Sequence, residues 1–313
     1  MISRRTFAAG LAGAPLLPGA ETLTLIADPR FERGLKVWQP TAGVHNPAGM
    51  IQPPGASRGP VWGAAQWYSH FNLAHAKREA LPSGSSRFFD GAKAVTFGVA
   101  GSPEADAVFA LDGCKEYGDR APEKGDPWPH LLMEQELTNH PYWSALQSVP
   151  FRIDYRLLQS QPFHLPGWND QRHTAQFLLY ITIRNGNRDS PGYRDYLWFG
   201  VPMYDARWPL PKRYTAPDKG SAKKPGTGKF IFLPGGEEYT TKSAQDGAWV
   251  SIDRDLLPLI RESLETAWSA GYLQDSRRPE DYQLAGMNMG WEVTGPLAVA
   301  MQVRGLSLAA VTD

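Results

Sequence analysis

The chain has 313 residues, of which 42% are apolar and 12% aromatic, so it can bury a sizeable core as one large domain or two ordinary ones. Its 32 basic and 32 acidic residues cancel, which excludes an electrostatic footprint for nucleic acid or an anionic membrane. The 31 Gly and 27 Pro indicate many turns between short strands.

The first 20 residues resemble an export signal. Residues 3–7 read SRRTF, which is similar to the twin-arginine motif, and after a short apolar run residues 18–20 (PGA) offer small side chains for cleavage. The run is too short to span a bilayer as a permanent helix. The lone Cys114 cannot form an internal disulfide, which agrees with export of a protein already folded in a reducing cytoplasm. We therefore expect cleavage near Ala20 and a mature protein that is periplasmic or secreted, without membrane attachment.

From residue 94 onward the chain breaks into runs rich in β-branched and aromatic residues, each bounded by Gly, Pro, Asn or Asp. The predicted strands are 94–100, 107–113, 130–137, 151–159, 175–185, 195–205, 229–234, 282–293 and 297–311. Two more are expected in the Pro- and Gly-rich region 28–73, near LKVWQ and VWGAAQWYSHF.

Residues 255–271 (DLLPLIRESLETAWSAG) have a helical period instead. Their apolar side chains follow one stripe with charged residues opposite, which predicts an amphipathic helix. Asp255 suits the N-cap, Pro258 falls in the first turn, and Gly271 suits a left-handed stop. One late helix among many strands predicts an all-β fold, a β-sandwich of two antiparallel sheets with the helix across the outer side of one sheet.

We expect a single domain over residues 21–313. No period of about 20 to 50 residues repeats, which argues against solenoids and propellers. The stretch 211–228 is basic and rich in Pro and Gly, so we expect an exposed loop at the rim of a cleft, not a linker between domains.

The predicted strand HLLMEQEL carries two carboxylates among apolar residues. Alternate residues of a strand share a face, so His130, Glu134 and Glu136 point away from the core, with the two carboxylates about 7 Å apart by strand rise. The next long strand turns Arg152 and Arg156 outward. A neighbouring Arg would hold one carboxylate ionised, and two crowded carboxylates would split their pKa values, as acid and nucleophile roles require. The alternative is a solvated face with charge pairs across strands.

The last third of the chain resembles glycoside hydrolase family 12. The elements follow in the same order: YRDYLWFGVPMYD, KFIFLP, the helix, GWEVTGP and a final strand. Residues 290–295 (GWEVTG) are similar to the family's G-x-E-P-F-x-G motif, whose acid/base Glu corresponds to Glu292. Residues 193–198 (YRDYLW) are loosely similar to its Y-E-x-M-I-W nucleophile strand, with Asp195 in place of Glu and the spacing shifted.

The resemblance implies a concanavalin A-like jelly roll in which one concave sheet binds a polysaccharide. It implies a glycoside hydrolase with Glu292 as general acid/base and Asp195 as nucleophile, while Glu134 or Glu136 are the alternatives for the second carboxylate. Hydrolysis requires two carboxyl groups about 5 to 5.5 Å apart for retention, or about 6.5 to 9.5 Å apart for inversion.

Indole rings flank these acids, and sugar rings stack on such faces. Trp128, Trp143 and Trp291 are therefore candidate sugar platforms, whereas Trp198 is assigned to the core. The candidate substrate-binding set is completed by His130, Arg152 and Arg156.

Two other functions stay open, because a fold alone does not select a function. A non-catalytic carbohydrate-binding protein of the same fold would keep the indoles and need no carboxylate pair. A polysaccharide lyase would use Arg152, Arg156 or Arg194 to neutralise a uronate, and His or Tyr to remove a proton. A lyase makes a product that absorbs in the ultraviolet, a hydrolase makes reducing ends without it, and a lectin makes neither.

The seven His include no H-E-x-x-H or H-x-H pattern, and a single Cys excludes a thiolate zinc site, so we expect no metal centre and no cofactor. Jelly rolls of this kind often hold a structural Ca²⁺, for which an acidic loop such as EKGDP (123–127) could serve, although nothing specifies a site. We expect a monomer whose partner is a polysaccharide or oligosaccharide.

Overall fold

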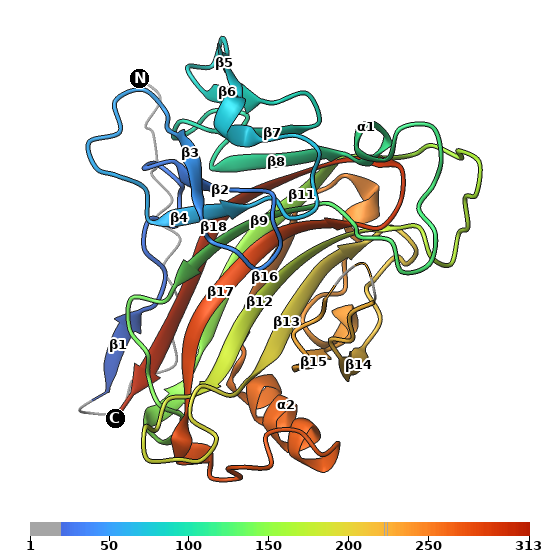
Figure 1. The fold of residues 1–313 in the computed structure, drawn as a ribbon. Coiled ribbons are helices and arrows are strands. Elements are labelled where there is room, and N and C mark those ends of the chain that lie inside the picture. Colours follow the sequence, from blue (N-terminus) through green and yellow to red (C-terminus); the bar gives the residue numbers. More distant parts are fainter. Residues whose placement is uncertain (1–19, 222, 224) are drawn as a thin grey trace, which may run out of the picture.

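The computed structural model describes residues 20–221, 223 and 225–313. Apart from Ala20, the expected export signal lies outside the described residues. Two large curved sheets pack face to face in a β-sandwich (Figure 1).

The sheets are named here by their central strands. The β18 sheet has the order β16 (Val250–Asp255), β11 (Pro150–Pro162), β18 (Leu297–Thr312), β8 (Ala107–Asp112), β7 (Lys93–Phe97), β6 (Ser86–Phe89) and β5 (Lys77–Ala80), and both β1 (Glu21–Thr24) and β10 (Leu146–Ser148) also pair with β18. The β17 sheet has the order β14 (Tyr214–Pro217), β15 (Phe230–Leu233), β13 (Tyr196–Asp205), β12 (Ala175–Asn185), β17 (Tyr282–Val293), β9 (His130–Glu136), β4 (Trp62–Ala65), β2 (Leu35–Trp38) and β3 (Pro47–Ile51). Neighbouring strands are antiparallel except β13 with β15 and β2 with β4.

The predicted fold, an all-β jelly-roll sandwich with an amphipathic helix near 255–271, is confirmed. The nine predicted runs correspond to β7, β8, β9, β11, β12, β13, β15, β17 and β18, and the two runs expected in the region 28–73 contain β2 and β4. Several short strands and the one-turn helix α1 (Gly113–Tyr117) were not predicted. Strand β5 shows why: its four residues are all exposed, so no apolar alternation marks it.

The core lies between the two sheets and is built from the inward residues of alternating strands. Met133 and Phe177 of the β17 sheet and Phe109 of the β18 sheet are fully buried there. Trp291 crosses the interface, because its indole N–H donates to the Phe109 carbonyl at 2.9 Å. The packing fixes which face of the β17 sheet points outward.

Helix α2 (Leu257–Ser269) ends as predicted, but its N-cap is Leu256 instead of Asp255, and the helix lies elsewhere. The Asp255 carboxylate accepts from the Leu257 N–H at 3.0 Å, Pro258 is in the first turn, and Gly271 has φ +86° just after the end. Its apolar stripe faces β10 of one sheet and β13 and β15 of the other. The helix therefore closes one end of the sandwich (Figure 1) instead of crossing the outer side of a sheet.

Within the part of the chain that the structure describes, neither helix has the length and apolar content that a membrane span requires.

Candidate functional site

The outer face of the β17 sheet gathers the acids predicted on β9. Along this strand Leu131 and Met133 are buried against the core, while Glu134 and Glu136 point to the other side with His130. Glu292 of the neighbouring strand β17 lies on the same face, directly opposite His130. The predicted outward row of β9 is therefore present, and β17 adds the third acid.

The register separates Glu292 from Glu134. Glu292 pairs with His130, whereas Glu134 pairs with Asn288, four residues further along the strand. Four residues of strand span about 13 Å, which exceeds the separation of hydrolase carboxyl pairs. The predicted pairing of these two glutamates is wrong, because the register of β9 against β17 places His130, and not Glu134, opposite Glu292.

Asp195 is still more remote from Glu292. Across β12, the residue Gln176 pairs with Glu292 on one side and with Asp205 on the other, ten residues from Asp195. Asp195 therefore lies at the opposite end of the sheet, roughly 30 Å away by strand rise. Its carboxylate pairs with Lys229 Nζ at 2.6 Å. The predicted nucleophile role of Asp195 beside Glu292 is wrong.

The Glu134 side chain is mostly buried beneath the rings of Trp38 and His45. Its Oε1 accepts from the Trp38 indole N–H at 2.7 Å and lies 2.8 Å from His45 Nε2. Gly63, its partner on β4, makes room, because a Cβ there would overlap the Trp38 ring. Burial raises the pKa of Glu134, and the nearby Glu136 adds to this, against His45 and the Trp38 hydrogen bond, which lower it.

Glu136 has very different surroundings. Its side chain is 66% exposed, with Arg184 Nη2 of β12 and His140 Nε2 each 3.6 Å from one carboxylate oxygen. Gly286 lies opposite it on β17 and leaves space on the sheet surface. The two carboxylates of β9 therefore sit side by side on one strand, one buried and one solvated beside a cation.

The Glu292 end of the face is lined by rings. His130 Nε2 accepts from the Trp128 indole N–H at 3.1 Å and lies 3.8 Å from Glu292 Oε1. The rings of Trp67 and Tyr68 lie 5.7 Å and 6.1 Å from the His130 ring. The predicted site residues Trp128 and His130 are thus grouped with Glu292, and they touch each other.

The other predicted indoles are distributed differently from expectation. Trp291 is fully buried in the core and Trp143 packs at the α2 end, with the Arg261 guanidinium 5.5 Å from its ring centre, so neither is a platform on the outer face. Trp198, which was assigned to the core, lies on the outer face beside Tyr180. Adjacent residues of a strand point opposite ways, so Trp291 could not share the face of Glu292.

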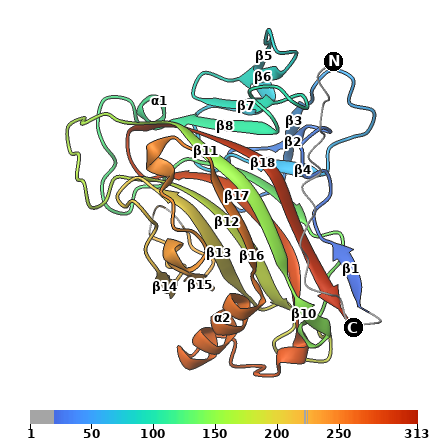
Figure 2. The same ribbon diagram turned by 180° about the vertical axis from the view of Figure 1, so that it is seen from behind.

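Arg152 and Arg156 were also predicted wrongly as substrate contacts. Both belong to β11, in the other sheet, whose strands β11, β16 and β18 face the viewer in Figure 2. Arg156 donates to Gln302 Oε1 at 2.8 Å and covers the Trp249 ring. After β9 the chain crosses to the β18 sheet, and no local pattern marks that crossing. The lyase hypothesis therefore loses these two arginines as candidate partners for a uronate.

Sequence reasoning missed Trp38, His45 and Trp67, which come from the Pro- and Gly-rich region whose role was not predicted. A signal was present: in the run LKVW, burial of Leu35 and Val37 puts Trp38 on the outer face. His45 had no such signal, because it belongs to no strand and reaches Glu134 from a loop.

The β13 side of the outer face is covered. Leu178, Tyr180 and Leu233 form a small apolar cluster there with Trp198. The stretch 211–228, expected as a loop, contains the edge strand β14. After β14 the Ser221 hydroxyl donates to the Gly125 carbonyl and Lys223 pairs with Asp126 at 2.6 Å. This side of the outer face is therefore mainly apolar and aromatic, whereas the β9 side carries Glu134 and Glu136.

Among the described residues, no group of three or more His, Cys, Asp or Glu side chains is placed to hold a metal ion. Asp126, from the acidic loop considered for Ca²⁺, has its carboxylate engaged by Lys223. The outer face therefore presents carboxylates, imidazoles and indoles as its chemical groups.

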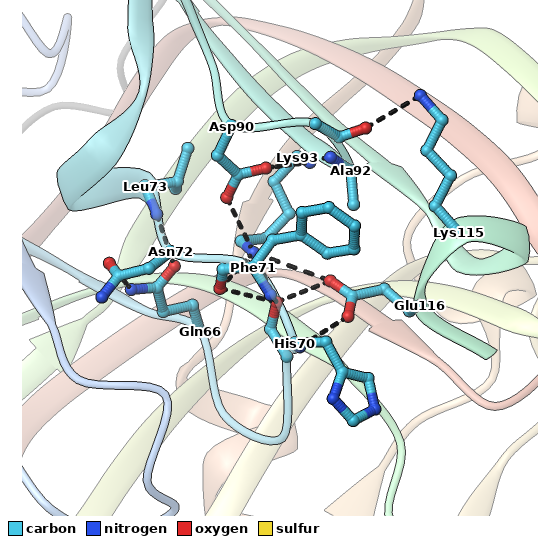
Figure 3. Close-up of polar contacts among 12 residues, drawn as sticks. Gln66, His70, Phe71, Asn72, Leu73, Asp90, Ala92, Lys93, Lys115 and Glu116 are labelled. Atoms are coloured by element: carbon cyan, nitrogen blue, oxygen red, sulfur yellow. Dashed lines mark hydrogen bonds and ion pairs between the residues drawn. The ribbon is translucent and has the colours of Figure 1, made fainter. Parts of the chain in front are cut away.

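A separate buried polar cluster surrounds Lys93 at the start of β7 (Figure 3). Its ammonium contacts Asp90 Oδ2 at 2.9 Å, Glu116 Oε1 at 3.6 Å and the Ser69 hydroxyl at 2.5 Å. Ser69 also lines a cavity of about 500 Å³. The cluster thus pairs one buried cation with two buried carboxylates, and the Ser69 hydroxyl contacts both Lys93 and Glu116. We therefore assign the cluster to stability.

No family model and no curated protein matches the sequence. Solved structures similar in fold include a cellulase derived from Cel12A of Rhodothermus marinus, with 12% identity, TM-score 0.39, and 76% of this chain and 96% of that chain covered. A family 12 xyloglucanase from Bacillus licheniformis has 10% identity, TM-score 0.39 and coverage of 75% and 96%. A family 11 xylanase from Neocallimastix patriciarum has 8% identity, TM-score 0.36 and coverage of 76% and 95%.

Proposed function

We propose that the protein is a glycoside hydrolase that cleaves a polysaccharide on the outer face of the β17 sheet, with Glu134 as proton donor and Glu136 as base. One observation carries the proposal: two carboxylates of β9 point to the same side, and one is buried while the other is solvated. No cofactor is needed, because two carboxyl groups and a water suffice for this chemistry.

The spacing favours inversion of configuration. Alternate residues of a strand are about 7 Å apart, inside the range of inverting enzymes and beyond that of retaining ones. Glu134 bonds to Trp38 on the β2 side, whereas Glu136 contacts Arg184 on the β12 side, so the two carboxyl groups lean away from each other. The gap between them suits a sugar and an attacking water.

The environments suit the two roles. A raised pKa keeps the Glu134 proton available for the glycosidic oxygen, while Glu136 is exposed to solvent with Arg184 Nη2 3.6 Å away. Glu136 takes a proton from water as the water oxygen attacks the anomeric carbon, and Glu134 gives its proton to the leaving oxygen as the old C–O bond breaks. Ionised Glu134 and protonated Glu136 remain, and exchange with solvent restores both.

Rings beside Glu134 would bind the sugar. The Trp38 and His45 ring centres are 5.7 Å apart, and those of His45 and Trp67 are 6.5 Å apart. These three rings lie next to one another on the β2 side of Glu134, where the C–H faces of a sugar could stack. The mostly exposed His45 also contacts the acid itself, so it connects binding to the donor.

A second candidate is a non-catalytic carbohydrate-binding protein. The observation that favours it is that the residue opposite Glu292 on β9 is His130 and not a second carboxylate. Such a protein would keep the rings and bind sugar without turnover.

The deciding experiment measures new reducing ends from a panel of neutral polysaccharides, with the anomer of the product followed by NMR. We expect cleavage with inversion, and a loss of at least about 100-fold in kcat for Glu134→Gln and for Glu136→Gln. Asp195→Asn is the matched control and should keep full activity. Binding without reducing ends would select the carbohydrate-binding alternative, and a product absorbing in the ultraviolet would select a lyase.

We also propose that residues 1–20 direct export, so that a monomeric mature protein works in the periplasm or outside the cell. Replacing Arg4 and Arg5 together by Lys should retain the full-length chain in the cytoplasm, as cell fractionation would reveal. Export of that variant at the normal level would contradict the proposed signal.

A further inference from the structure

A cavity of about 670 Å³ opens at an end of the sandwich, between the two sheets. Its walls come from the end of β11, the loop before β12, the end of β13 and the turn at residues 245–247. The Tyr204 hydroxyl donates to Ser160 Oγ at 2.7 Å and so joins the sheets at this point. The carboxylate pair of β9 contributes nothing to these walls, so the cavity is a separate feature.

Two partly exposed indoles, Trp168 and Trp208, line the cavity. Between them lie polar side chains that can give and accept hydrogen bonds: Gln159, Ser160, His164, Asp170, Gln171, Gln245 and Asp246. Concave sites that combine apolar rings with a few polar groups are typical of small-molecule binding. The combination suits a sugar ring, which has an apolar C–H face and a rim of hydroxyls.

Both indoles are held in position. The Trp168 N–H donates to Asp170 Oδ1 at 2.5 Å, and the ring packs edge-on to His164 with centres 4.9 Å apart. The Trp208 carbonyl accepts from Gln245 at 3.0 Å, and Lys212 Nζ lies 3.4 Å from the centre of its ring. Fixed rings lose little conformational entropy when they bind a ligand, which favours affinity.

The charges of the lining favour an uncharged ligand. The Arg207 guanidinium makes two hydrogen bonds to Asp205, at 2.9 Å and 2.6 Å, so its charge is compensated. The exposed carboxylates of Asp170 and Asp246 also line the cavity, and the Lys212 ammonium lies against the Trp208 ring. With charges of both signs present, the two carboxylates would accept hydrogen bonds from the hydroxyls of a neutral sugar.

We propose that this cavity is a second saccharide-binding site that takes a short stretch of neutral glycan, with Trp168 and Trp208 as its platforms. The ligand class rests on the proposed function, but the site does not depend on Glu134 or Glu136. It would hold a polymer on the enzyme while another part of the same or a neighbouring chain meets the carboxylates.

The test is affinity electrophoresis of the full chain with Glu134→Gln, which prevents cleavage, in gels containing xyloglucan, xylan, mixed-linkage β-glucan or polygalacturonate. We expect retardation by at least one neutral polysaccharide, with the apparent affinity lowered about tenfold by Trp168→Ala or Trp208→Ala. Trp168→Phe and Trp208→Phe keep an aromatic face and should retain most of the binding, which separates loss of the site from loss of the fold.

Trp249→Ala is the matched control. This indole lies against Arg156 and Arg304 on the outer face of the β18 sheet and does not line the cavity. Equal retardation of the Trp168, Trp208 and Trp249 variants would overturn the inference, as would stronger binding of polygalacturonate or no binding by the parent chain. Loss of binding in the Trp168 variant together with no hydrolysis by the wild type would sustain this site and refute the catalytic proposal.

Discussion

Glu134 and Glu136 illustrate how surroundings separate two identical side chains. They share a strand and a face, but Glu134 is only 17% exposed under Trp38 and His45, while Glu136 is 66% exposed beside Arg184. Burial disfavours a charged carboxylate, so the proton is held more tightly at residue 134. The difference supplies an acid and a base from a single strand.

His45 tunes the proposed acid, which leads to a prediction for the pH profile. Its imidazole lowers the pKa of Glu134, so His45→Ala should raise that pKa further. A proton donor works only while protonated, so the alkaline limb of kcat/KM against pH should move to higher pH. His140→Ala, which alters only the surroundings of Glu136, is the control and should leave that limb in place. An alkaline limb that moves to lower pH in His45→Ala would contradict the assigned role of Glu134.

We expect glycine to be required at residue 63 because the Trp38 ring lies against it. A Cβ at this residue would overlap the Trp38 indole, so Gly63→Ala should displace the ring and break its hydrogen bond to Glu134. We expect a loss of about 1 to 3 kcal/mol in the free energy of unfolding, as for other overpacked sites. Urea denaturation measures it, and Gly59→Ala, where nothing lies within 4 Å, should change little.

A double substitution tests the cause. If the clash with the indole is responsible, Gly63→Ala should cost much less in a Trp38→Ala background, since the ring is gone. Equal losses in both backgrounds would show that the backbone of β4, and not Trp38, requires the glycine.

At the scale of residues, the alternation of β9 was predicted correctly, but the positions of three indoles, Trp143, Trp198 and Trp291, were predicted wrongly. Strand β9 has an exposed end, so its period of two is visible. Every residue of β17 except Glu292 is buried, because both faces of this strand are covered. The hydrophobicity pattern therefore did not show which face of β17 carries Trp291. Only the charged side chain of Glu292, next to it in the strand, could have shown this.

At the scale of elements, the Lys93 cluster fastens β7 to α1 and to the loop that carries Ser69 (Figure 3). Lys93→Met would leave Asp90 and Glu116 buried without their cation. We expect a loss of about 3 to 5 kcal/mol in the free energy of unfolding, measured by urea denaturation. Adding Asp90→Asn and Glu116→Gln should recover part of it, because the uncompensated charges are then removed.

Lys115→Met is the control for this cluster. Lys115 is about half exposed and its ammonium lies 3.9 Å from Asp112, so its removal should cost less than about 1 kcal/mol. If Lys93→Met were as mild as Lys115→Met, the cluster would not fasten these elements.

The strands themselves were predictable, but their neighbours were not. Local composition marks a strand, whereas the sheet to which it belongs depends on contacts far apart in the chain. Strand β9 lies between β17 and β4, and β11, the next long strand, belongs to the other sheet. Arg152 and Arg156 were therefore placed beside Glu134 although a whole sandwich separates them.

At the scale of the molecule, the candidate site is assembled from both ends of the chain. Strands β2 and β4 come from the N-terminal region, β9 from the middle and β17 from the C-terminal region, and together they form one stretch of the β17 sheet (Figure 1). The resemblance to known glycosidases covered only the last third, so it could not supply Trp38 or His45. The partners of the proposed acid lie in the region for which the sequence offered no motif.

His173 joins two loops at the other end of the sandwich and should make stability depend on pH. Its Nδ1 accepts from the Asn169 N–H at 2.9 Å, while its Nε2 lies 2.8 Å from the Pro122 carbonyl oxygen and 3.1 Å from the Arg172 Nε. Burial lowers the pKa of His173 below its usual value near 6.5. Protonation would place a second proton against the Asn169 N–H, so the folded state prefers the neutral ring.

The direction in which pH changes the free energy of unfolding follows from proton binding. Below about pH 6.5 the unfolded chain binds a proton here more readily than the folded one, so this contribution is complete at higher pH and is lost as the pH falls toward the folded pKa. We expect the free energy of unfolding to depend less steeply on pH between about 5 and 6.5 in His173→Gln than in the wild type, as measured by urea denaturation at each pH. His164→Gln, at an exposed position, should keep the wild-type slope. A slope unchanged in His173→Gln would mean that His173 titrates alike in both states and that its contacts with Asn169, Pro122 and Arg172 do not select the neutral form.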